Sequence, residues 1–244
     1  MKPPPFSIRG VRVVRDGRIV LDRVDLTIGS GEFVALLGPN GVGKSTLIAA
    51  MLGLLPISEG RIEIFGADLH RFRDWRRIGY VPQRPPAVGV PASLLEVTLL
   101  GRLSSRRLVG GYGKEDREAA ERALATVGLR DRAGDLAANL SGGQQQRLRV
   151  ARALASEPDV LVLDEPFSWV DVQTEADLIG ALTNFRSGGG TVLFVAHDLH
   201  ELEHLVDRVV VLRSGAVVAD GPPGSVAIPE LDHRHEHEPH GPTS

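Results

Sequence analysis

The chain has 244 residues, of which 42% are hydrophobic and 24% charged, an ordinary composition for a globular domain long enough to bury a core. Its 28 Lys and Arg against 31 Asp and Glu give a net charge of −3, so no overall basic field attracts nucleic acid and we expect no nucleic-acid partner. Cysteine is absent, which excludes disulfides and thiolate metal sites. No run approaches the roughly 18 apolar residues that cross a bilayer, so we expect a soluble protein whose contact with a membrane depends on a partner.

Short apolar runs bounded by turn residues predict strands along much of the chain, and helical patterns lie between them. Four of the runs are almost continuously apolar, as in strands buried on both faces of a sheet. The alternation predicts an α/β fold built on mainly parallel strands. The predicted strands are 33–37, 61–65, 78–81, 160–164 and 191–196, with a closing hairpin of 208–212 and 216–219. The predicted helices are 43–53, 93–100 (opening on the capping box of Ser93 and Glu96), 114–127, 145–155 and 171–186.

Two stretches break this rhythm. From about residue 84 to 156 the chain shows helical patterns and no convincing strand, which predicts an all-helical insert between two strands of the sheet. From 222 to 244 it is polar and rich in histidine, and we predict a disordered tail. Imidazoles interleaved with carboxylates suit Zn²⁺, whereas the alternative is a solvated tail without function. The histidines concerned are His233, His235, His237 and His240.

The segment 38–45 has the spacing of a P-loop, and it lies between a predicted strand and a predicted helix. Its glycines let backbone N–H groups approach phosphates, and the helix N-terminus adds a favourable dipole. Lys44 is expected to reach the β- and γ-phosphates, while the Ser45 hydroxyl can ligate Mg²⁺. We therefore expect ATP and Mg²⁺ as ligands, bound by Gly38, Pro39, Asn40, Gly41, Val42, Gly43, Lys44, Ser45 and Thr46.

Two carboxylates end the apolar run 160–163. A P-loop enzyme holds Mg²⁺ with an acid at the end of a neighbouring strand, a role that suits Asp164. Glu165 is then expected to face the γ-phosphate, where it can polarise the attacking water as the catalytic base. By itself this pair is a weak signal, because many buried strands end in an acidic residue, but beside a P-loop it is specific.

A second anion site is predicted at Leu140-Ser141-Gly142-Gly143-Gln144, which offers a hydroxyl and unobstructed N–H groups before a helix. Alone, it would be a loop with a capping serine. Between a P-loop and an acidic strand end, it resembles the signature of the ABC ATPase nucleotide-binding domains, and the resemblance covers about 6–221. The resemblance implies a P-loop NTPase core with an N-terminal antiparallel β portion and an all-helical signature subdomain at about 84–156. It also implies that Ser141, Gly142, Gly143 and Gln144 bind nucleotide.

The same resemblance suggests roles for further residues. Gln83 is similar to the family glutamine that contacts Mg²⁺ and senses the membrane partner. Asp171 resembles the aspartate of the D-loop, and His197 resembles the catalytic histidine that contacts the γ-phosphate. Arg15 stands where an aromatic residue usually stacks on adenine; a guanidinium can also stack, and the base selectivity stays open. Trp169 occupies a D-loop position commonly held by a small residue.

The mechanism implied by the resemblance is a switch between two copies paired head to tail. Each ATP lies between one P-loop and the partner's signature, so that the dimer closes on ATP and opens after hydrolysis. The implied partners are a second copy, an integral membrane permease and an extracellular or periplasmic substrate-binding protein, with this chain cytoplasmic and peripheral on the inner face of the cell membrane.

The transported substrate is indicated by Tyr80–Gln83 and 94–102, which are similar to the zinc and manganese import ATPases. This similarity favours import of a divalent metal. The alternatives are an importer of another substrate, an exporter, and a soluble ATPase of the iron–sulfur assembly type. The last of these families usually lacks the run Gln144–Arg147 that is present here.

Overall fold

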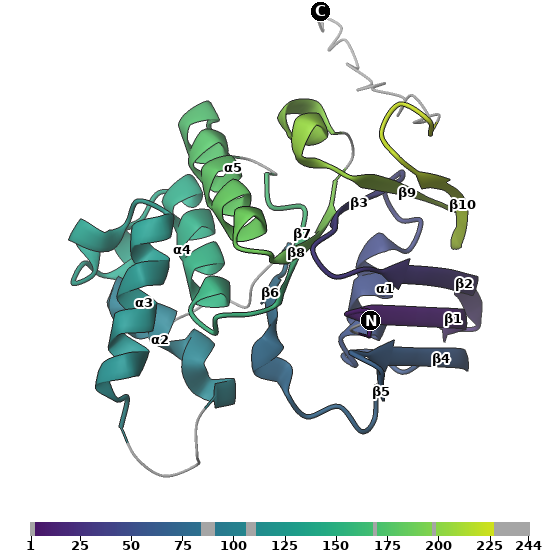
Figure 1. Ribbon diagram of the computed structural model, residues 1–244, viewed down its shortest axis with the longest axis horizontal. Helices are drawn as coiled ribbons and strands as arrows, with labels where there is room; N and C mark the ends of the chain where they lie inside the picture. The colour runs from purple at the N-terminus through teal and green to yellow at the C-terminus, as the bar shows by residue number, and fades with distance from the viewer. Residues whose placement is uncertain (1–2, 84–90, 106–110, 168–169, 197–198, 227–244) are drawn as a thin grey trace, which may run out of the picture.

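The computed structural model describes residues 3–83, 91–105, 111–167, 170–196 and 199–226. Figure 1 shows its layers: helices α2 to α5, a six-stranded sheet, helix α1 and a four-stranded sheet. The strands are β1 (Phe6–Arg15), β2 (Arg18–Ile28), β3 (Phe33–Leu37), β4 (Glu59–Ile64), β5 (Ala67–Asp68), β6 (Ile78–Val81), β7 (Val160–Asp164), β8 (Thr191–Val195), β9 (Arg208–Arg213) and β10 (Ala216–Gly221). The α-helices are α1 (Lys44–Met51), α2 (Leu94–Leu99), α3 (Lys114–Thr126), α4 (Gly142–Leu154) and α5 (Val172–Ser187). Short 3-10 helices are η1 (Trp75–Arg77), η2 (Leu100–Ser105), η3 (Arg130–Arg132), η4 (Ala137–Asn139) and η5 (His200–Leu205).

The six-stranded sheet has the order β10-β9-β3-β8-β7-β6, and all its pairs are parallel except the hairpin of β9 and β10. Every residue of β3, β7 and β8 is buried. This confirms the prediction from the continuous apolar runs, because strands covered on both faces have no solvent-facing side to mark with polar residues.

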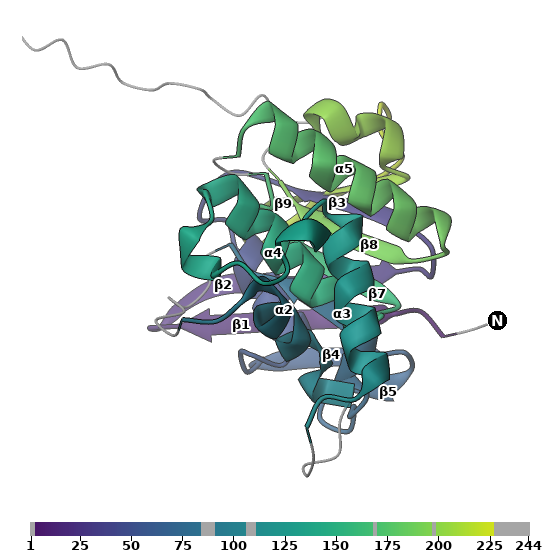
Figure 2. The same cartoon turned by 90° about the vertical axis from the view of Figure 1, so that its left-hand side faces the viewer.

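Alternate residues of β3 point into two separate cores. Phe33, Ala35 and Leu37 pack with the inner faces of α3, α4 and α5, whereas Val34 and Leu36 pack with α1 and the four-stranded sheet. Figure 2, seen from the helical side, shows α2 to α5 in front of the strands. Helices α1 and α4 therefore cover opposite faces of the six-stranded sheet.

The N-terminal antiparallel portion implied by the family resemblance is the four-stranded sheet, in the order β2-β1-β4-β5. Its first hairpin turns at Asp16 and Gly17, whose φ angles of 49° and 73° fit the tight turn that Asp-Gly favours. Arg15 and Arg18 form the last register pair before this turn.

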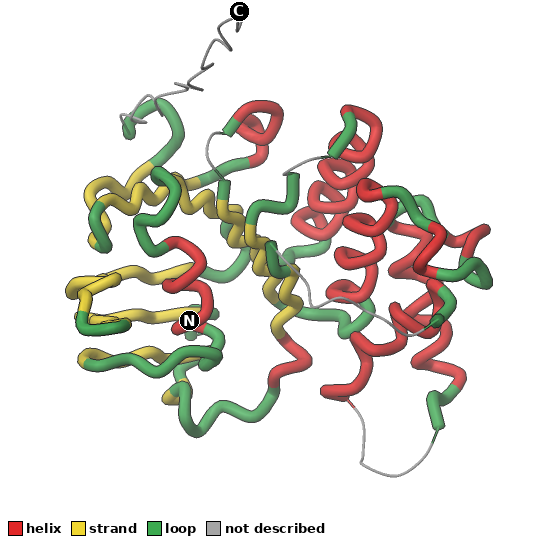
Figure 3. Tube along the Cα trace, turned by 180° about the vertical axis from the view of Figure 1, so that it is seen from behind, coloured by secondary structure: helices red, strands yellow, loops and turns green. Residues whose placement is uncertain are grey.

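Between β6 and β7 every described element is helical, and Figure 3 shows this layer beside the strands. Ser93 caps α2 through the predicted capping box with Glu96. Helix α4 begins at Gly142, before the predicted start at 145, because Ser141 and Gln144 form a second capping box that encloses both glycines in the first turn. None of the described helices combines the length and apolarity needed to cross a bilayer.

Candidate functional site

The loop between β3 and α1 requires glycine at two of its positions. Gly38 has a φ of 149°, and a Cβ there would overlap the carbonyl oxygen of Leu212 in β9. Gly43 has a φ of 109°, and a Cβ there would lie 2.9 Å from Leu21 Cδ2 and 3.0 Å from the carbonyl oxygen of Val20. Strands β2 and β9 thus hold the loop from two sides, so its shape is fixed by packing as well as by its own torsion angles.

Lys44 is the buried cation of this loop, with 5% of its surface exposed. Its Nζ donates hydrogen bonds to the carbonyl oxygens of Gly38 (2.6 Å) and Pro39 (3.0 Å). Burial lowers the pKa of the Lys44 ammonium, and the nearby carboxylates of Glu165 and Asp164 oppose that shift. The ammonium is therefore held inside the loop, close to both acids predicted from the sequence.

Asp164 ends β7 and is 3% exposed. Burial raises the pKa of its carboxyl, while a hydrogen bond from the Ser45 side chain and the charge of Lys44 lower it. Its Oδ1 is buried and accepts no hydrogen bond from the described part of the chain. A buried oxygen of this kind has unused acceptor capacity that a cation or a metal-bound water can take up.

Glu165 occupies the left-handed backbone region with a φ of 51° and donates its N–H to the carbonyl oxygen of Val195 in β8 (3.1 Å). Such strain in a residue other than glycine is typical of functional positions. The Gln83 Nε2 donates a hydrogen bond to Glu165 Oε2. Because β6 and β7 are parallel neighbours, the residues that follow their carboxyl ends meet, and the structure brings the predicted Gln83 and Glu165 together.

The signature residues lie in another layer. Ser141 is the N-cap of α4: its Oγ accepts from the Gln144 N–H (3.3 Å), and its own N–H donates to Gln144 Oε1 (3.1 Å). The apolar residues of α4 pack in the core shared with α5, whereas those of α1 pack in the core on the other face of the sheet. The signature and the P-loop of one chain therefore belong to helices on opposite faces of the six-stranded sheet (Figure 1).

Three further predicted positions have different surroundings. Asp171 caps α5, with Oδ1 accepting from the Thr174 N–H (2.8 Å) and Oδ2 from the Thr174 hydroxyl (3.1 Å). Arg15 is exposed at the end of β1. His197 and the four tail histidines lie outside the described residues, and no group of three or more His, Cys, Asp or Glu side chains suited to a metal ion is found within the described ranges.

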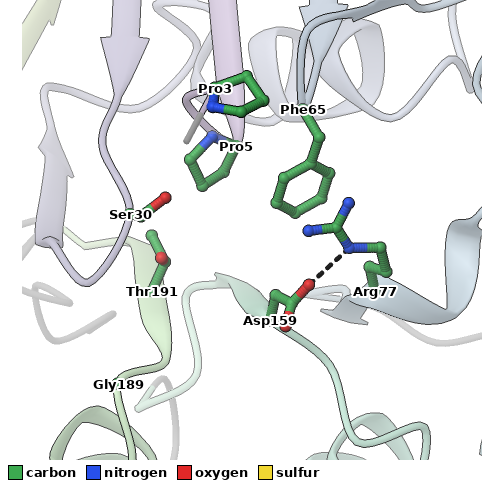
Figure 4. Close-up of a pocket in the computed structure, with 8 residues that line it drawn as sticks. All are labelled: Pro3, Pro5, Ser30, Phe65, Arg77, Asp159, Gly189 and Thr191. Carbon is green, nitrogen blue, oxygen red and sulfur yellow. Dashed lines mark hydrogen bonds and ion pairs between the residues drawn. The ribbon is translucent and has the colours of Figure 1, made fainter. Parts of the chain in front are cut away.

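A pocket of about 240 Å³ lies at the other edge of the sheet, where β6, β7 and β8 begin (Figure 4). The Arg77 guanidinium lies 3.5 Å from the centre of the Phe65 ring and pairs with Asp159 at 2.5 Å. None of the predicted nucleotide-binding residues lines this pocket. The predicted P-loop, Gln83 and Asp164 lie instead at the carboxyl ends of β3, β6 and β7, the edge at which open parallel sheets bind ligands.

Sequence reasoning missed one group of residues around the signature, at the contact of α4 with α5. A Cβ on Gly143 would overlap Thr174 Oγ1 and lie 3.0 Å from Asp171 Oδ2. No sequence signal relates Gly143 to Thr174, because this contact depends on how two helices pack.

Comparison with known proteins identifies the family. The pattern of the ABC transporter family matches residues 21–168. The manganese transport system ATP-binding protein MntB of Bacillus subtilis is 41% identical, covering 86% of this chain and 83% of MntB. The zinc transport system ATP-binding protein TroB of Treponema pallidum is 39% identical (83% and 75% covered), and the zinc import ATP-binding protein ZnuC of Paramagnetospirillum magneticum is 40% identical (89% and 77% covered).

Solved structures agree with this result. A dimeric bacterial ABC transporter cassette superimposes with a TM-score of 0.78 at 30% identity, covering 89% of this chain and 98% of that one. A dimeric ATP-binding cassette in a post-hydrolysis state, bound to ADP and phosphate, gives a TM-score of 0.77 at 29% identity with the same coverage. The chain therefore belongs to the ABC transporter family, as one of its ATP-binding and ATP-hydrolysing subunits.

Proposed function

We propose that this subunit powers the import of a divalent metal ion, manganese or zinc, through a membrane permease. The observation that carries the substrate is that the relatives reported above are manganese and zinc transport subunits that share 39–41% identity over most of their length. The observation that supports the energy source is the meeting of Lys44, Asp164, Glu165 and Gln83 at the carboxyl edge of the sheet.

In the proposed site, the N–H groups of the loop 38–46 and the Lys44 ammonium hold the phosphates of ATP. Glu165 accepts the proton of the attacking water, and Gln83 orients the Glu165 carboxylate through its hydrogen bond. His197 contacts the γ-phosphate, and Arg15, at the tip of the first hairpin, stacks on the base.

The residues present fit Mg²⁺, because Asp164 offers a buried oxygen without a hydrogen-bond partner in the described chain and Ser45 offers a hydroxyl beside it. Oxygen ligands of this type suit the ion, which we propose is held by Ser45, Asp164 and Gln83. When bound, Mg²⁺ neutralises charge on the phosphate oxygens. The positive charge of the bound ion would also oppose the upward shift that burial gives to the pKa of Asp164.

We further propose a head-to-tail pair of chains. Within one chain, α1 and α4 cover opposite faces of the sheet, so the signature residues Ser141–Gln144 are available to the nucleotide of a second copy. Asp171 lies beside the signature and belongs to the same interface. The γ-phosphate then contacts both chains, so ATP binds more tightly to the closed dimer than to a single chain and shifts the equilibrium towards closure.

We assign the ATPase domain to residues 6–221, its helical subdomain to about 84–156 and the tail to 222–244. Through the helical subdomain, closure is passed to an integral membrane permease on the cytoplasmic face of the membrane. A substrate-binding protein on the outer side delivers the metal. Because the net charge is −3, the chain has no overall basic field to attract nucleic acid, and we propose no nucleic-acid partner.

The test is capture of the chain from detergent-solubilised native membranes, with its partners identified by mass spectrometry. A polytopic permease is expected, and Mn²⁺ or Zn²⁺ accumulation by the cells should depend on the subunit. A soluble assembly protein in place of any membrane protein would overturn the transport assignment while leaving the ATPase chemistry intact.

The histidine-rich tail gives a separate prediction. Deleting residues 231–244 removes His233, His235, His237 and His240 together with the interleaved acids, so Zn²⁺ bound per chain should fall while ATPase activity stays unchanged. Equilibrium dialysis with Zn²⁺ measures this. A chain with the same tail but these histidines replaced by glutamine separates metal binding from tail length. Equal Zn²⁺ binding by full-length and truncated chains would show that the tail is only a solvated segment.

A further inference from the structure

The start of the signature helix is packed against the start of α5 without room for a side chain. A Cβ on Gly143 would overlap the Thr174 hydroxyl and lie 3.0 Å from Asp171 Oδ2. Thr174 is buried, and it is fixed by two hydrogen bonds to the Asp171 carboxylate. The first turn of α4 therefore rests directly on the cap of α5.

One turn further along α4, an ion pair joins the same two helices. Arg147 Nη1 donates to Asp177 Oδ2 at 2.6 Å, and the two side chains are 15% and 29% exposed. Asp177 Oδ1 also accepts from Gln173 Nε2 at 3.1 Å. Both oxygens of Asp177 are thus engaged, and a partly buried, charge-assisted bond of this kind is directional.

The Arg147 guanidinium also acts on the cap of α5. Hydrogen bonds from Thr174 lower the pKa of Asp171, and the charge of Arg147 adds to that shift. The Arg147 Nε is buried and has no hydrogen-bond partner in the described part of the chain, and an unmade buried bond opposes stability. Because the buried Nε lacks an acceptor among the described residues, this arginine costs stability that an apolar side chain at the same contact would not cost. We infer that its role is functional.

This contact joins two parts of the proposed reaction site. On one side lies the signature, Ser141–Gln144, and on the other lies Asp171, in the segment that follows the catalytic base Glu165. We propose that Arg147 and Asp177 are positioning residues that lock the signature to the start of α5 at Asp171, so that both parts already have their relative positions when the dimer binds ATP.

This inference rests on the proposed head-to-tail dimer. With the lock in place, α4 and α5 move together, and a signature that binds the partner's γ-phosphate brings its own Asp171 segment with it. Without the lock, part of the free energy of ATP-dependent dimerisation is spent on fixing α4 and α5 relative to each other. The expected result is weaker ATP-dependent pairing and weaker coupling between the two sites, while ATP binding to a single chain is unaffected.

The test compares Arg147→Ala, Asp177→Asn and the charge-exchanged pair Arg147→Asp with Asp177→Arg. We expect each single variant to weaken ATP-dependent dimerisation of the Glu165→Gln chain about tenfold, within the range of allosteric couplings, and to lower the Hill coefficient for ATP in the Glu165 chain. The ATP dissociation constant of the monomer should change by less than about twofold. The exchanged pair should recover part of the dimerisation.

The matched control is Arg186→Ala, which breaks the Arg186–Asp207 ion pair at the other end of α5. It should lower the thermal midpoint without changing dimerisation. If Glu165→Gln alone fails to dimerise with ATP, the proposed dimer fails. If it dimerises and Arg147→Ala leaves both pairing and Hill coefficient intact, the lock is refuted. The lock is supported if the single variants lose dimerisation while their thermal midpoints equal that of the control, or if the exchanged pair recovers dimerisation. It is contradicted if all variants, including Arg186→Ala, lose dimerisation equally.

Discussion

The Glu165→Gln variant is expected to bind ATP almost normally and to hydrolyse it about 10²–10⁴ times more slowly. The exchange keeps the size of the side chain and removes the carboxylate that we propose accepts the proton of the attacking water. Gln83 holds the Glu165 carboxylate from the side of β6, and the backbone of Glu165 is bonded to Val195 of β8, so the amide should occupy the same place. The rate loss corresponds to about 3–5 kcal/mol of transition-state stabilisation.

Single-turnover hydrolysis and light scattering of the ATP-bound chain measure the two halves of this prediction. The variant should accumulate as an ATP-dependent dimer, because the step that reopens the dimer is blocked. Glu203→Gln is the control, since it makes the same chemical change at an exposed position. Turnover like that of the parent chain would exclude Glu165 as the base and direct attention to other acceptors beside the P-loop.

The central strands could be predicted because their environment leaves a simple mark on the sequence. Strands β3, β7 and β8 are buried on both faces, so each reads as an unbroken apolar run. The carboxyl ends of such strands lie at one edge of the sheet, which is why the sequence alone predicts that the P-loop and the Asp164–Glu165 pair lie together.

Strands β1 and β2 show no comparable pattern of apolar residues in the sequence. Register shifts interrupt the pairing of β1 with β2, and Gly10 and Arg23 adopt positive φ angles of 56° and 50° within them. Each irregularity moves the following side chains to the other face, so the alternation expected of a half-buried strand is lost. Only the family resemblance predicted an antiparallel portion there, and it gave no residue bounds.

The start of α4 and its contact with α5 show a different limit. Gly142 and Gly143 disfavour a helix by intrinsic propensity, so the predicted start fell at 145. In the structure the capping box of Ser141 and Gln144 compensates for that propensity, and the lack of a side chain on Gly143 is what lets Thr174 approach. The helix start follows from this local capping box, whereas the choice of glycine at 143 depends on tertiary packing and could not be derived from local sequence.

The second large effect is expected from Lys44→Ala, which should raise the ATP dissociation constant about a hundredfold, or ~2.7 kcal/mol. The Lys44 ammonium is already desolvated: burial lowers its pKa, and the carboxylates of Glu165 and Asp164 oppose that shift. Because most of its water has been given up before ATP arrives, its attraction to the phosphates is not offset by a new desolvation penalty. The variant also loses the bonds from Nζ to Gly38 and Pro39 that brace the loop.

Titration of the purified chain with ATP by calorimetry measures this loss of affinity. Lys114→Ala is the control, because Lys114 is exposed and its ion pair with Glu118 is long, at 3.6 Å.

A comparison of ATP with ADP separates the two contributions of Lys44, which are its charge and its hydrogen bonds within the loop. If the charge acts on the γ-phosphate, the variant should lose more affinity for ATP than for ADP. If bracing of the loop dominates, both nucleotides should weaken equally, because the carbonyl groups of Gly38 and Pro39 then need new partners whichever nucleotide is bound. Unchanged affinity for both would mean that the phosphates do not lie over this loop, and the assignment of the nucleotide site would fail.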